Sequence, residues 1–62
     1  MKAIRNYALE SEADLARIAL QGADIPGVVV GVGIGMKSGV LLVPEDRIEA
    51  ALKVLNDLEE RR

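Results

Sequence analysis

The chain contains neither cysteine nor histidine among its 62 residues. Disulfide bonds are therefore excluded, and a zinc site would need carboxylate ligands alone, which is unusual chemistry for zinc. A serine nucleophile also has no histidine within the chain to activate it. We therefore expect no metal, no cofactor and no enzymatic activity.

Aromatic residues and clustered positive charge are also scarce. Tyr7 is the only aromatic residue, and the 8 basic residues are outnumbered by 10 acidic ones. Nucleic-acid surfaces combine clustered Lys and Arg with stacking aromatics, so we expect no nucleic-acid binding. Without disulfides or a metal, a chain this short has only marginal stability alone, which favours a homo-oligomer.

Long hydrophobic runs are missing as well. The longest apolar stretch, residues 25–36, is short and rich in glycine, whereas a membrane-spanning helix needs about 20 apolar residues. The N-terminal segment becomes polar too early for a signal peptide. These patterns predict a cytoplasmic protein that does not enter a membrane.

The residues that the chain does contain predict five secondary-structure elements in the order β-α-β-β-α. Hydrophobic periodicity and β-branched residues place strands at 1–7, 28–34 and 40–43, and helices at 9–22 and 44–62. A right-handed crossover followed by a hairpin gives a three-stranded antiparallel sheet of order 1-3-2 with both helices on one face. We therefore predict a single ferredoxin-like α+β domain over residues 1–62 that lacks the last strand of that fold.

The first helix carries recognisable signals at both ends. Ser11 is expected to cap its N-terminus, and Gly22 is expected to supply a left-handed C-terminal cap. Leu15, Ile18 and Ala19 form the stripe that is predicted to face the core, widened by Ala16 and Leu20.

The stretch GVGIGMKS, residues 31–38, is one residue short of a phosphate-binding loop, because Met36 replaces the second glycine of that motif. A phosphate-binding loop also needs a helix after the lysine and serine. Here a predicted strand, VLLV, follows. We therefore interpret the stretch as a strand and hairpin loop, and propose the loop as a ligand- or partner-binding segment: Gly35, Met36, Lys37, Ser38 and Gly39.

Alternation along the second strand predicts a bare face. Val28, Val30 and Val32 share one face with Ile34, while the other face carries Val29 and glycines at every second position. Since two helices can cover only one face and the sheet edges also need partners, we expect two or more copies to pair through their uncovered faces or to join their edges, with the glycines allowing close approach. The predicted interface residues are Val29, Gly31, Gly33, Leu41 and Val43.

Two stretches, ESEADLARIALQGADIPGVVV and GVLLVPEDRIEAALKVL, resemble a small bacterial family of signal-transducing proteins with a domain of unknown function. The matching positions are 12–17, 24–26, 41–46 and 49–52. The resemblance covers nearly the whole chain and implies the βαββα half of nitrogen-regulatory signalling proteins. It carries no established catalytic residues over to this sequence.

Three functions remain open at this point. The first is a non-enzymatic regulatory or adaptor module, a homo-oligomer that presents its hairpin loop to an unidentified protein partner. The second is a sensor of a nucleotide or another anionic metabolite, suggested by Lys37 in the glycine-rich loop. The third is a structural assembly subunit, since a glycine-faced apolar strand suits stacking.

Overall fold

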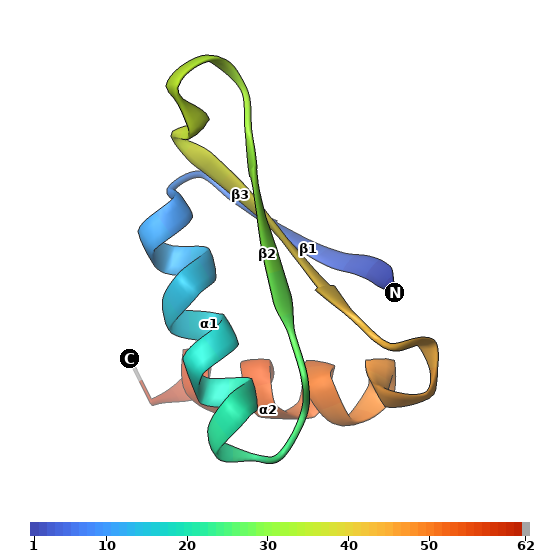
Figure 1. Ribbon diagram of the computed structural model, residues 1–62. Coiled ribbons are helices and arrows are strands. Elements are labelled where there is room, and N and C mark those ends of the chain that lie inside the picture. The colour runs from blue at the N-terminus through green and yellow to red at the C-terminus, as the bar shows by residue number, and fades with distance from the viewer. Residues whose placement is uncertain (62) are drawn as a thin grey trace.

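The computed structural model describes residues 1–61, with Met36 described by its backbone alone. Its elements follow in the order β1 (Lys2–Tyr7), α1 (Glu10–Gly22), β2 (Val28–Val32), a 3-10 helix η1 (Ile34–Met36), β3 (Ser38–Val43), a 3-10 helix η2 (Glu45–Arg47) and α2 (Ile48–Glu60). The strands form one antiparallel sheet of order β1-β3-β2 (Figure 1). This arrangement confirms the predicted ferredoxin-like α+β fold.

The core lies between the sheet and the two helices. Leu41 and Val43 of the central strand β3 are fully buried there, against Leu20 of α1 and Leu55 of α2. Ile25, in the connection that follows α1, is buried in the same cluster. No helix among the described residues has the length and apolar character needed to cross a membrane.

The ends of α1 differ from the predicted caps. Leu9 is the N-cap residue, its backbone is extended, and it makes no side-chain capping bond. The backbone N–H of Glu10 instead donates to the carbonyl of Lys37 at 2.8 Å. Ser11 already lies inside the helix, so the predicted serine cap is wrong.

The predicted glycine cap at the other end of α1 is wrong too. Gly22 is the last helical residue, and the left-handed position falls two residues later at Asp24, with φ of 64°. The backbone N–H of Ile25 then donates to the carbonyl of Leu20 at 2.9 Å. This turn brings Ile25 into the core, which the sequence pattern alone did not indicate.

The buried stripe of α1 is rotated relative to the prediction. Ala13, Ala16 and Leu20 are buried, while Leu15 and Ile18 remain 54% and 52% exposed. The reason is the short distance between α1 and β3: a Cβ built on Gly39 would lie 2.9 Å from the Cβ of Ala13. Only small side chains fit such a contact, so the larger residues turn outward.

Candidate functional site

The side of the sheet that faces away from the helices is uncovered and apolar. Val28, Val30 and Val32 project from β2 on this side and are 43%, 47% and 45% exposed. Val40 and Leu42 lie beside them on β3, paired with Val30 and Val28. We call this surface the open face; it comprises Ala3, Asn6, Val28, Val30, Val32, Ser38, Val40 and Leu42. None of these residues is charged.

The structure reverses the predicted assignment of faces. Val29, Leu41 and Val43, which were expected at an oligomer interface, lie on the helix side of the sheet. Leu41 and Val43 are fully buried by the chain's own helices. Gly31 lies on this same side, paired with Gly39. The glycine face therefore accommodates α1 and leaves the valine row exposed.

The glycine repeat also ends earlier than predicted. Gly33 and Gly35 have φ of 87° and 77°, in the region that favours glycine. They therefore turn the chain out of β2, so that Gly33 is not part of a sheet face. Between them Ile34 is fully exposed, although the sequence pattern had placed it in the valine row. The glycines on both sides of Ile34 were the feature of the sequence that could have predicted this turn.

The predicted binding loop is divided between a turn and a strand. Gly35, Met36 and Lys37 connect the strands, whereas Ser38 and Gly39 already belong to β3. The Ser38 hydroxyl donates to the carbonyl of Val32 at 3.0 Å, and Gly39 is buried. The side chain of Met36 lies outside the part that the structure describes. Strand β3 follows directly, so a phosphate-binding loop with its helix is absent here.

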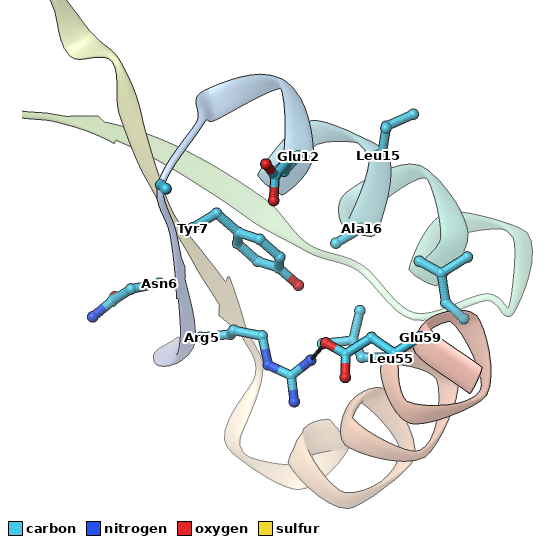
Figure 2. Close-up of a pocket in the computed structure, with 10 residues that line it drawn as sticks. Arg5, Asn6, Tyr7, Glu12, Leu15, Ala16, Leu55 and Glu59 are labelled. Carbon is cyan, nitrogen blue, oxygen red and sulfur yellow. Dashed lines mark hydrogen bonds and ion pairs between the residues drawn. The ribbon is translucent and has the colours of Figure 1, made fainter. Parts of the chain in front are cut away.

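A hollow of about 240 Å³ opens where β1 meets the two helices (Figure 2). An ion pair between Arg5 and Glu59 crosses it, and the ring of Tyr7 points into it. Asn6 points away from the hollow. The remaining lining comes from both helices and the β1–α1 turn: Ala8, Glu12, Leu15, Ala16, Leu55 and Leu58.

The described residues form no arrangement typical of a catalytic or metal centre. Within residues 1–61 no polar or charged side chain is buried, and no group of three acidic residues could hold a metal ion. The hollow therefore offers an exposed ion pair and apolar walls for a small molecule. The open face offers an uncharged apolar surface.

The chain matches no protein-family model, no curated protein and no solved structure.

Proposed function

We propose that this protein is a non-enzymatic regulatory or adaptor module that acts as a homo-oligomer and binds a protein partner through its open face. The observation that carries the proposal is the row of exposed valines on β2 continued by Val40 and Leu42 on β3. Contiguous apolar patches of this kind are characteristic of protein interaction sites. The regulatory character is suggested by the resemblance to bacterial signal-transducing proteins.

The chemistry of the open face indicates the kind of partner. Its centre contains aliphatic side chains only, and the uncharged Asn6 and Ser38 lie at its margin. Interface centres are similarly depleted in charge. We therefore propose that the partner contributes an apolar surface, such as the non-polar stripe of an amphipathic helix, because helices pack readily on sheet faces.

The proposal is tested by affinity capture from the native cytosol with matched baits. Val40→Lys places a charge in the middle of the open face, and Ile18→Lys places the same charge on the exposed outer side of α1. A partner retained by the wild-type and Ile18→Lys baits, but lost from Val40→Lys, supports the open face as the binding site. Equal retention by all three baits contradicts it. Circular dichroism confirms that each bait is folded.

A sensor of a small anionic molecule is the second candidate; it depends on the hollow, where an anion would have to compete with Glu59 for the Arg5 guanidinium. A thermal-shift screen of nucleotides and other anionic metabolites tests it. Stabilisation that persists in Lys37→Ala but disappears in Arg5→Gln would place the ligand in this hollow. The reverse pattern would place the ligand at the hairpin loop.

A further inference from the structure

The two edges of the sheet differ in how they are protected against pairing. Edge strands are commonly blocked by charges, prolines and bulges. Strand β1 has a register irregularity between Ala3 and Arg5 and carries two cations, Lys2 and Arg5. Strand β2 is paired with β3 through five consecutive residues and has no charge, proline or bulge. Its outer edge has no neighbouring strand within the described chain.

We propose that β2 pairs with β2 of a second copy, antiparallel and across a two-fold axis at Val30, to form a continuous six-stranded sheet. This proposal rests on the homo-oligomer proposed above and identifies its contact surface. Strand β2 stands at one end of the strand order β1-β3-β2, so its outer edge is the one that a second copy can reach.

The register follows from the faces of the strand. A two-fold axis perpendicular to the sheet places each β2 residue opposite a residue of the partner subunit whose side chain is on the same face of the sheet. With Val30 on the axis, Val28 lies opposite Val32 of the partner subunit, and both belong to the open face. On the helix side, Val29 lies opposite Gly31 of the partner subunit. Each valine there fills the space left by a glycine, and all five residues of β2 are paired.

Neighbouring registers are less favourable. An axis at Val29 would oppose two valines on the helix side, and an axis at Gly31 would oppose two glycines and leave a gap. The register with its axis at Gly31 also needs Gly33 to pair with Val29 of the partner subunit, but Gly33 is no longer in the extended strand, since its φ is 87°. The axis at Val30 is therefore the one that uses the full strand.

Charge favours a second copy as the occupant. Arg17 lies beside Gly27, the residue before β2: a Cβ built on Gly27 would be 3.6 Å from the Cγ of Arg17. Glu10 lies beside Gly39, which is paired with Gly31 near the other end of the strand. The two-fold axis brings these ends together, so Arg17, whose Nε donates to Asp14 of its own chain at 3.1 Å, turns its remaining N–H groups toward the acidic start of the partner subunit's α1. Pairing β1 with itself would instead bring Lys2 and Arg5 near their own copies.

The size of the contact sets its strength. Five residues of strand span about 17 Å, and one strand edge buries less than the ~800 Å² per partner of a standard interface. We therefore expect a dimer that dissociates on dilution through the micromolar range. A closed two-fold pair also leaves only the protected β1 edges at its ends, which prevents growth into a filament.

Cysteine cross-linking tests the register, since the natural chain has no thiol. We expect Val30→Cys to form a covalent dimer on mild oxidation, because directly opposite residues have Cβ atoms about 5 Å apart. Val28→Cys and Val32→Cys should each stay uncoupled alone, because four residues separate each from its copy. Mixed together, with one isotopically labelled, they should couple to each other. Equal coupling of all three single variants would overturn the proposed register.

Sedimentation equilibrium separates edge pairing from face pairing. Val30 and Val40 lie side by side on the open face, but only Val30 is on the edge strand. We expect wild type and Val40→Lys to show twice the 6.6 kDa chain mass at high micromolar concentration, and Val30→Lys to be a monomer. If both lysine variants are monomers, the copies join through the open face and the edge proposal fails while the homo-oligomer stands. A monomeric wild type would overturn both.

Discussion

At the scale of single residues, the contact between Gly39 and α1 is the tightest constraint. A Cβ at this position would lie 2.9 Å from the Cβ of Ala13 and 3.4 Å from the Cα of Glu10. Neither atom can move away by a side-chain rotation. Glycine at 39 therefore sets how closely the helix layer approaches the sheet.

We expect Gly39→Ala to lower the free energy of unfolding by about 1–3 kcal/mol, as for overpacked cores. Gly22→Ala is the matched control, because a Cβ there meets no atom within 4 Å and alanine is favoured over glycine in a helix. Urea titration followed by circular dichroism measures both variants. Equal stability of the two would show that α1 does not approach β3 this closely.

The N-terminus of α1 has no side-chain cap. Leu9 has the extended backbone of an N-cap residue but no side chain that can accept a hydrogen bond. Leu9→Ser would place a hydroxyl there, with Glu12 three residues later completing a capping box. We expect a gain of about 0.5–2 kcal/mol, measured by urea unfolding.

Ser11→Ala is the control for this cap, and its stability should be unchanged or slightly increased, because alanine is the better helix former inside a helix. A loss of about 1 kcal/mol in Ser11→Ala would mean that Ser11 is the N-cap after all.

At the scale of elements, the β2–β3 hairpin depends on two glycines with different backbone conformations. Gly33 has φ of 87° and ψ of 177°, whereas Gly35 has φ of 77° and ψ of 5°. The first region is essentially restricted to glycine, while the second lies near the left-handed region that asparagine tolerates. The two positions should therefore respond differently to substitution.

We expect Gly33→Ala to destabilise the protein by about 1–3 kcal/mol, and Gly35→Asn to have a much smaller effect. Thermal unfolding of the two variants provides the comparison. If Gly35→Asn proved to be the more damaging change, the turn between the strands would have a different geometry from the one described.

At the scale of the whole molecule, stability and association are expected to be linked. A chain whose copies pair only when they are folded gains stability on association, because association removes the folded monomer from its equilibrium with the unfolded chain. The melting temperature of the wild type should therefore rise with protein concentration. Val30→Lys should melt at a temperature that does not depend on concentration. A wild-type melting temperature independent of concentration would contradict this coupling.

The sequence by itself determined the order of the elements and the topology of the sheet. Local signals were sufficient for this: three valines in a row, the glycine-rich hairpin and the apolar periodicity of residues 48–58. The right-handed crossover and the hairpin then left one arrangement of the strands. The same signals predicted a hairpin between the last two strands with no helix after Ser38, although the connection covers residues 33–37 instead of 35–39.

Only the tertiary structure decided which face of the sheet is covered. Alternation along β2 separates valines from glycines, but period-two patterns do not say on which side the helices pack. That choice depends on the contact between Gly39 and Ala13, 26 positions apart in the sequence and brought together by the fold. Because small residues on both elements allow α1 to approach β3, Gly39 is buried, Val29 and Gly31 of β2 face the helices, and Val28, Val30 and Val32 face outward.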